Sequence, residues 1–148
     1  MELKYSVKTD SQDVKAMGRD LNVSFKDLVI VSDAVRGKKL QKAINILEQV
    51  ANLKRPIPYK KYQTGVGHRK GSQVKIGKYP EKAAKHALDV LRNLESNAQF
   101  KGLDTDKLKI THIQALKGVA RLRRKPKGRW TVWNTQYCHL QAVAKELK

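Results

Sequence analysis

The first pattern along the chain is an alternation of apolar and polar side chains near its amino terminus. Leu3, Tyr5 and Val7 are separated by polar residues, which is the period-two arrangement of a strand with one buried face. The residues that follow, as far as Asn22, are mainly polar and show no comparable period. The sequence therefore predicts a strand at the amino terminus and an irregular connection after it.

Two helices are predicted next. Ser24 is placed to cap the first helix, with Asp27 three residues later as in a capping box, and this helix should run to Arg36. Gly37 can end it in a left-handed conformation, and a second helix begins directly afterwards and must end before Pro56. The apolar face of the second helix comprises Leu40, Ala43, Ile44, Leu47, Val50 and Ala51.

A third helix and two strands complete the predicted elements. Pro80 suits the first turn of a helix, and Gly102 is placed to end it. The segments Leu108–Leu116 and Tyr137–Ala144 are rich in apolar residues and are predicted to be strands. Antiparallel pairing between them would make a hairpin with a long connection at its far end. The apolar stripe of the third helix comprises Ala84, Ala87, Leu88, Leu91, Leu94 and Ala98.

The distribution of charge indicates what kind of partner this hairpin binds. The chain has 32 Lys and Arg against 13 Asp and Glu, a formal charge of +19 on 148 residues, which is far more than solubility requires. Residues 107–145 contain no acidic residue, and seven cations lie between Lys117 and Arg129. Such charges repel one another unless phosphates supply the counter-charge. The extended hairpin, at about residues 115–137, is therefore predicted to bind a polyanion.

A second acid-free stretch lies between Glu48 and Glu81. It contains several glycines and predicts an irregular basic loop at about residues 54–78. Both acid-free stretches contain Gly and Pro, whereas a solvated helical face mixes charges of both signs. The length and the 40% hydrophobic content indicate that residues 1–148 form a single domain with a modest core.

RNA is favoured over duplex DNA as the polyanion. The sequence has no pattern of a recognition helix, zinc finger or heptad dimer, and no aromatic ribonucleoprotein motif. Flexible basic loops suit irregularly folded RNA, where shape and phosphate spacing dominate recognition. Tyr59, Tyr62, Trp130 and Trp133 are candidates either for stacking on bases or for covering apolar surface. The position of Trp130 next to Arg129 favours RNA.

Other chemistry finds little support in the sequence. The segment Gly65–Gly71 lacks the Gly-Lys-Ser/Thr ending of a nucleotide-binding loop, and Asp104 and Asp106 fit a turn better than a cation site. The four histidines have no metal-ligand spacing, and no nucleophile lies beside an obvious base. The sequence therefore predicts a binding protein without a catalytic, metal or cofactor site.

The only cysteine and the absence of long apolar runs bear on the compartment. Cys138 alone allows no disulfide framework within the chain and fits a reducing, intracellular location. The amino terminus lacks the apolar region of a signal peptide, and no apolar run approaches the ~20 residues needed to cross a bilayer. We therefore expect a soluble protein that does not insert into membranes.

At this point the sequence resembles a known family, the universal large-subunit ribosomal protein numbered twenty-two, called seventeen in older eukaryotic naming. The match extends over nearly the whole chain and is closer to the archaeal and eukaryotic branch than to the bacterial one. The segments that carry it are weak singly but specific in this order and spacing. They are Val23-Ser-Phe-Lys26, Arg36-Gly-Lys-Lys39, Pro58-Tyr-Lys-Lys-Tyr62, Gly65-Val-Gly-His-Arg69, Asn93-Leu-Glu-Ser-Asn-Ala98, Lys101-Gly-Leu-Asp104, His112-Ile-Gln114, Lys127-Gly-Arg129 and Cys138-His-Leu140.

The resemblance implies an α+β fold in which three helices pack on a small three-stranded antiparallel sheet with a long basic β-hairpin extension. It also implies a cytoplasmic, structural component of the large ribosomal subunit. Such a protein organises ribosomal RNA, contacts neighbouring ribosomal proteins and contributes its hairpin to the nascent-peptide exit tunnel. The residues expected to contact RNA are Arg36, Lys38, Lys39, Lys60, Lys61, Tyr62, His68, Arg69, Lys70, Lys117, Arg121, Arg123, Arg124, Lys125, Lys127, Arg129 and Trp130.

Composition alone leaves other classes of protein open. An architectural nucleic-acid-binding protein that acts outside the ribosome would have a similar charge. An RNA-modifying enzyme would need a cofactor pocket or a convergent acid/base cluster, for which the sequence gives no sign. A basic module for acidic proteins or membranes would need an amphipathic basic helix, whereas the cations here lie in Gly- and Pro-containing connections.

Overall fold

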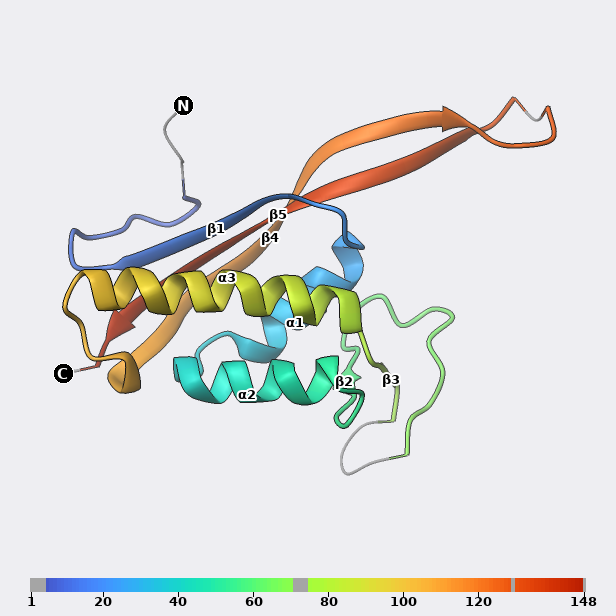
Figure 1. Ribbon diagram of the computed structural model, residues 1–148. Helices are drawn as coiled ribbons and strands as arrows, with labels where there is room; N and C mark the ends of the chain where they lie inside the picture. The colour runs from blue at the N-terminus through green and yellow to red at the C-terminus, as the bar shows by residue number, and fades with distance from the viewer. Residues whose placement is uncertain (1–4, 71–74, 129, 148) are drawn as a thin grey trace.

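The structure is a computed structural model that describes residues 5–70, 75–128 and 130–147. Within these residues, three α-helices lie against a three-stranded antiparallel sheet with the strand order β1-β5-β4 (Figure 1). This arrangement confirms the predicted α+β class. The elements in chain order are β1 (Val14–Leu21), α1 (Phe25–Val35), α2 (Leu40–Ala51), β2 (Ile57–Pro58), β3 (Gly77–Lys78), α3 (Glu81–Phe100), the 3-10 turn η1 (Thr105–Lys107), β4 (Leu108–Arg124) and β5 (Val132–Glu146).

The central strand β5 supplies the middle of the core. Cys138, Leu140, Ala142 and Ala144 alternate along it and are fully buried in one cluster with the apolar faces of the helices. Helix α3 packs against β1 and β5, while α1 packs mainly against β4. The period-two pattern of β5 therefore matches a strand with one face on the helical layer.

A bulge in β4 keeps its apolar residues on that face. The pairing register shifts between Ile110, which lies opposite Ala144, and His112, which lies opposite Val143. After this shift Ile113 is again fully buried, whereas an uninterrupted strand would have turned His112 towards the core.

The predicted strand at the amino terminus is wrong. Of its residues, Leu3 lies outside the described part of the chain, and Tyr5–Val7 form no strand. The edge strand is instead β1, in the stretch for which no element was predicted. Its period was hidden because the inward-facing residues are small. A Cβ on Gly18 would lie 2.8 Å from Cγ2 of Val90, so α3 approaches this strand too closely for a larger residue.

The ends of the helices follow the predicted signals. The Oγ of Ser24 accepts a hydrogen bond from the backbone N–H of Asp27 at 3.5 Å, which caps α1. Gly37 and Gly102 adopt φ angles of +73° and +71° after α1 and α3. These left-handed conformations are accessible to glycine without a Cβ clash, so both glycines stop their helices as expected.

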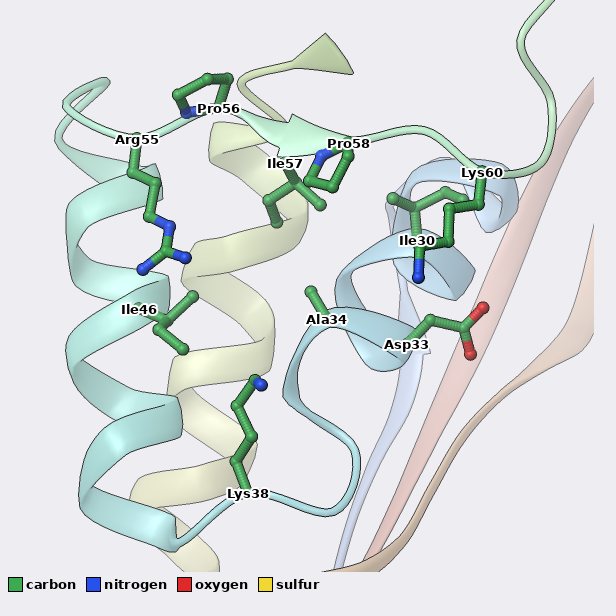
Figure 2. A pocket seen from close by; sticks show the side chains of 10 residues that line it. All are labelled: Ile30, Asp33, Ala34, Lys38, Ile46, Arg55, Pro56, Ile57, Pro58 and Lys60. Carbon is green, nitrogen blue, oxygen red and sulfur yellow. The ribbon is translucent and has the colours of Figure 1, made fainter. Parts of the chain in front are cut away.

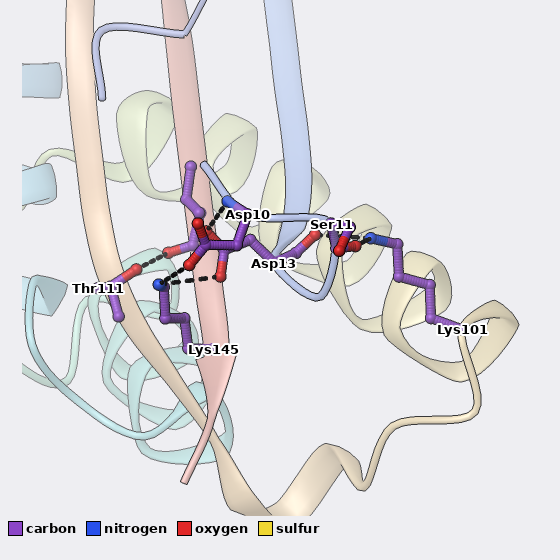
Figure 3. Close-up of polar contacts among 7 residues, drawn as sticks. Asp10, Ser11, Asp13, Lys101, Thr111 and Lys145 are labelled. Atoms are coloured by element: carbon purple, nitrogen blue, oxygen red, sulfur yellow. Dashed lines mark hydrogen bonds and ion pairs between the residues drawn. The ribbon is translucent and has the colours of Figure 1, made fainter. Parts of the chain in front are cut away.

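A cluster of ionic contacts closes the end of the sheet opposite the β4–β5 turn (Figure 3). The Nζ of Lys145 lies 2.9 Å from Oδ2 of Asp10 and 3.3 Å from Oδ1 of Asp13, whose side chain is buried. Lys101, after α3, donates hydrogen bonds to the backbone oxygens of Ser11 and Asp13. We call Asp10, Asp13 and Lys145 the Asp–Lys cluster. It joins the amino-terminal segment to β5, while Lys101 joins that segment to the end of α3.

Candidate nucleic-acid interface

The strands β4 and β5 continue as a pair beyond the core (Figure 1). Pairing runs from Ala120↔Gln136 to Arg124↔Val132, so both strands are longer than the sequence predicted. We call residues 117–136 the arm. Every described residue from 119 to 135 in it is exposed, which means that the arm is held by backbone pairing and has no core of its own.

Cations lie on both faces of the arm. Because side chains alternate along a strand, Arg121 and Arg123 share one face and Arg124 lies on the other. Among the described residues, no carboxylate lies within 4.0 Å of an arm cation. Lys125 and Lys127 occupy the turn, where Lys127 has a φ of +65°. The predicted site residue Arg129 lies outside the described residues.

Two arginines of the arm stack on aromatic rings. The guanidinium carbon of Arg124 lies 4.5 Å from the ring centre of Trp130, and that of Arg121 lies 5.1 Å from the ring centre of Tyr137. Stacking of this kind orients a guanidinium and leaves its N–H groups at the edge free to donate to phosphate oxygens. Trp130 is 87% exposed and therefore supports Arg124 without being buried itself.

The turn between α1 and α2 holds its cations against the body of the protein. Arg36 donates from Nη2 to the backbone oxygen of Ile113 at 2.8 Å and lies 3.4 Å from Asp33. The turn also exchanges two backbone hydrogen bonds with Ile110. Arg36 is therefore partly engaged in structure, whereas the exposed Lys39 beside it has its side chain in solvent.

Lys38 and Lys60, both predicted to contact RNA, line one pocket together with Arg55 (Figure 2). The pocket has a volume of about 240 Å³ and lies between α1, α2 and the segment around β2. Ile30, Ala34 and Ile46 contribute apolar surface to it. Lys38 from the α1–α2 turn and two cations from residues 55–60 thus surround a small hollow that the carboxylate of Asp33 also lines.

The basic loop exposes the predicted RNA-binding residues Lys60, Lys61, Tyr62, His68, Arg69 and Lys70. Its base is fixed by Tyr59, which is 3% exposed and donates from its hydroxyl to Oδ1 of Asp27 at 2.8 Å. Burial and this hydrogen bond raise the pKa of Tyr59 well above its ordinary value. Tyr59 is therefore a structural residue, and Tyr62 is the tyrosine of the pair that is available for stacking.

The structure brings Tyr62 and Lys117 together, although they are distant in sequence, and adds residues that the sequence did not single out. Phe25, Lys26 and Lys82 line a groove with them at the root of the arm. The one sequence signal for Phe25 and Lys26 was their place in the segment Val23-Ser-Phe-Lys26, which carries part of the family resemblance. His112 lies on the other side of Tyr62, where burial and the charge of Arg36 lower its pKa.

The remaining polar groups are explained by structure. Asp104 accepts a hydrogen bond from the N–H of Asp106 and lies 3.2 Å from Lys107, as expected of a turn. Cys138 is buried, and burial raises the pKa of its thiol. Over residues 5–70, 75–128 and 130–147, no group of three or more His, Cys, Asp or Glu could hold a metal ion. No helix in the same ranges has the length and hydropathy of a membrane span.

The sequence matches a known protein family and several of its members. A family model described as ribosomal protein L22p/L17e matches residues 16–145. The chain is 43% identical to the Large ribosomal subunit protein uL22 of Archaeoglobus fulgidus, over 95% of this chain and 93% of that protein. It is 42% identical to the protein of the same name from Staphylothermus marinus, over 97% and 95% of the two chains. The corresponding protein of Methanocaldococcus jannaschii is 37% identical over 98% and 96%.

Proposed function

The chain belongs to the ribosomal protein L22p/L17e family, and on that premise we propose that it is a structural constituent of the large ribosomal subunit that binds and organises ribosomal RNA. The similar archaeal proteins carry the name Large ribosomal subunit protein, which supports this assignment. Its role is binding and not catalysis, and its partners are ribosomal RNA and neighbouring ribosomal proteins in the cytoplasm.

The observation that carries the proposal is the charge of the arm. Six cations of its described residues are exposed, and no described carboxylate lies within 4.0 Å of any of them. In the free protein these cations repel one another, which is unfavourable. Bound RNA phosphates attract them instead, and the binding releases counterions from the RNA. A two-stranded ribbon without a core also gains order from a partner that surrounds it.

The protein organises RNA because its cations lie on separate elements. The arm, the turn at residues 36–39 and the basic loop start from different points of the body (Figure 1). Each can bind phosphates of a different RNA segment, and the rigid core then fixes the distance between those segments.

The arm is the part that we propose reaches the exit tunnel and contacts the nascent peptide. From Lys117 to Arg124 at about 3.3 Å per residue, β4 extends roughly 23 Å past the core. This reach and the exposure of both faces suit a ribbon that passes between RNA segments. The position in the tunnel rests on the family resemblance.

The proposal is tested by the salt dependence of binding to large-subunit ribosomal RNA transcribed in vitro. Each phosphate contact contributes about 0.7 to 0.9 to the slope of log affinity against log salt concentration. Replacing Arg121, Arg123 and Arg124 together by Gln should therefore make the slope shallower by about 2 to 3. A slope that does not change would overturn the role of the arm.

The matched control removes the same total charge elsewhere. Lys85, Arg92 and Lys107 lie outside the arm, each within 3.4 Å of a carboxylate. Their replacement by Gln therefore lowers the net charge by the same amount and leaves the arm unchanged. We expect a slope change of less than about 1. Equal changes in the two triple variants would mean that net charge, and not the arm, binds RNA. Co-sedimentation with large subunits at high salt separates the ribosomal role from an architectural role outside the ribosome.

A further inference from the structure

The groove at the root of the arm is large enough to hold a nucleotide. It has a volume of about 650 Å³, within the usual range for small-molecule sites, and lies where the start of α1, the basic loop, the start of α3 and the arm meet. Four separate segments therefore build it, and they hold it open in the folded protein.

Three aromatic rings give the groove faces on which a base can stack. Phe25 is half-buried against the core and provides a fixed platform, whereas Tyr62 and Trp133 are 41% and 58% exposed. Aromatic rings that are accessible next to positive charge are the usual means by which proteins bind unpaired bases.

Lysines supply the charge. Lys26, Lys82 and Lys117 line the groove, and no carboxylate is among the described residues that line it. Two of the ammonium groups lie over the rings, with Lys26 Nζ 5.5 Å from the centre of Tyr62 and Lys117 Nζ 5.5 Å from the centre of Phe25. Phosphates next to a stacked base would lie beside these cations.

Amide side chains complete the set of contacts that a base requires. Asn22 and Asn134 are exposed lining residues, and their side chains make no hydrogen bond to another described residue. Each offers two donors and an acceptor, which match the edges of an unpaired base. Gln136 differs because it already donates to the backbone oxygens of Gly118 and Tyr137.

The backbone of Tyr62 is held in an unfavourable conformation at this point. Its φ of +56° lies in the left-handed region, which is uncommon for a residue with a large side chain. Such conformations persist where the surrounding structure imposes them, and they are frequent in ligand sites. Tyr62 and Phe25 also line a second groove of about 500 Å³ that leads along α1 to Arg36 and His112.

We infer that the groove at the root of the arm binds one unstacked nucleotide of a single-stranded RNA segment, whose base stacks on Tyr62 and Trp133. The lysines bind the adjacent phosphates, and the strand continues through the second groove, where Lys61 and Arg36 are the cations and the carboxylate of Asp33 is paired with Arg36. This inference rests on the proposed function and makes it specific, because a protein that binds only the phosphates of RNA helices would need none of the aromatic contacts.

The test uses Trp133 as a reporter. The chain has two tryptophans, so the variant Trp130→Phe leaves Trp133 as its only one. The probes are an oligouridine of roughly 12 nucleotides, a length that a single binding groove can accommodate, and an abasic ribose-phosphate oligomer of equal length and charge. We expect oligouridine to quench the fluorescence of Trp133 and the abasic oligomer to bind, with steep salt dependence, without quenching it.

A second substitution locates the base. In the same background, Tyr62→Leu should weaken oligouridine binding about tenfold and leave binding of the abasic oligomer unchanged, because one stacking partner is lost. The matched control is Phe100→Leu, which removes an exposed ring at the far end of the 20-residue helix α3 and should change neither affinity.

The outcomes separate this inference from the function on which it rests. Salt-dependent binding of both oligomers with equal effects on Trp133 would overturn the nucleotide site and leave RNA binding intact. An equal loss of affinity for both oligomers in the Tyr62→Leu variant would also overturn it. If neither oligomer and no ribosomal RNA bound at any salt concentration, both the nucleotide site and the proposed function would be overturned.

Discussion

The two ends of the β4–β5 pair have the same backbone pairing and opposite surroundings. At one end, Ile110, Ile113 and Leu140 are fully buried beneath the helices. At the other end, Leu122 and Val132 are 66% and 63% exposed although the ladder continues between their strands. Backbone pairing therefore extends the sheet past the point where the burial of side chains ends, and a two-stranded ribbon without such burial is at best marginally stable in water.

The ionic contacts differ in the same way. Near the buried end, Lys145 lies within 3.3 Å of both carboxylates of the Asp–Lys cluster. Along the arm, Lys117, Arg121 and Arg124 lie over aromatic rings, and no described cation of the arm has a described carboxylate within 4.0 Å. At one end of the sheet a lysine is thus paired within the chain, whereas under the proposed function RNA phosphates would supply the counter-charge at the other end.

The largest expected difference between the two ends is in the free energy of unfolding. Leu140→Ala removes a fully buried side chain from the central strand and should lower the stability by about 2 to 5 kcal/mol. Leu122→Ala makes the same change in the arm and should alter it by less than about 0.5 kcal/mol. Urea unfolding followed by circular dichroism measures both. Similar losses would mean that the arm packs against something in the free protein.

The next effect concerns the buried carboxylate of the Asp–Lys cluster. Asp13→Asn keeps the shape of the side chain but weakens its contacts with Lys145 and with the backbone N–H of Asp10. Because Asp13 is 2% exposed, we expect a loss of about 1 to 3 kcal/mol in the same unfolding experiment. Asp106→Asn is the control, since that residue is exposed. An equally small effect of both changes would show that the cluster is not closed in solution.

The junction between body and arm should respond less strongly. A Cβ on Gly118 would lie 3.0 Å from the ring of His139 and 3.2 Å from the backbone oxygen of Tyr137, next to the register shift between Lys117 and Ala120. Gly118→Ala should therefore cost about 1 kcal/mol, because the ring can move but the backbone cannot easily do so.

Gly67→Ala serves as the control for the junction. A Cβ at that position would approach only the end of the flexible Arg69 side chain, at 3.9 Å, so the stability should not change. The affinity for ribosomal RNA reports on the arm in both variants. A Gly118→Ala variant with normal stability and normal affinity would show that the junction tolerates the added methyl group.

The same two ends also explain how far the sequence could predict the fold. The three helices were predictable because caps such as Ser24 and Gly37 and the helical period of the apolar residues agree. The strand ends were not, because Leu116 and Tyr137 mark the limits of burial and not the limits of pairing. A period of two is visible only where one face is buried, and the arm has no buried face.

The candidate site was predictable to a different extent in its charges and in its geometry. The acid-free runs indicated the arm and the basic loop, because charge composition is readable along the chain. The groove was not predictable, since Phe25, Tyr62, Lys82 and Trp133 meet only after the helices and strands have packed. Gly18 illustrates the same limit in the core, where a close helix made the strand invisible to a hydrophobic pattern.

The smallest effect in the comparison depends on pH. The hydrogen bond from Lys145, together with its charge, lowers the pKa of Asp10 below its ordinary value of 3.8. A carboxyl group whose pKa is lower in the folded protein stabilises it above the unfolded pKa, and this contribution is lost as the pH falls through the folded pKa. Melting temperatures between about pH 6 and about pH 2 should therefore fall less steeply at the acidic end for Asp10→Asn than for the unmodified protein.

Arg123→Gln should leave that steepness unchanged, because no described carboxylate lies within 4.0 Å of Arg123. High salt should reduce the difference, since the Asp10–Lys145 pair is exposed and its attraction is screened. Parallel curves for all three proteins at low salt would show that Lys145 does not pair with Asp10 in solution.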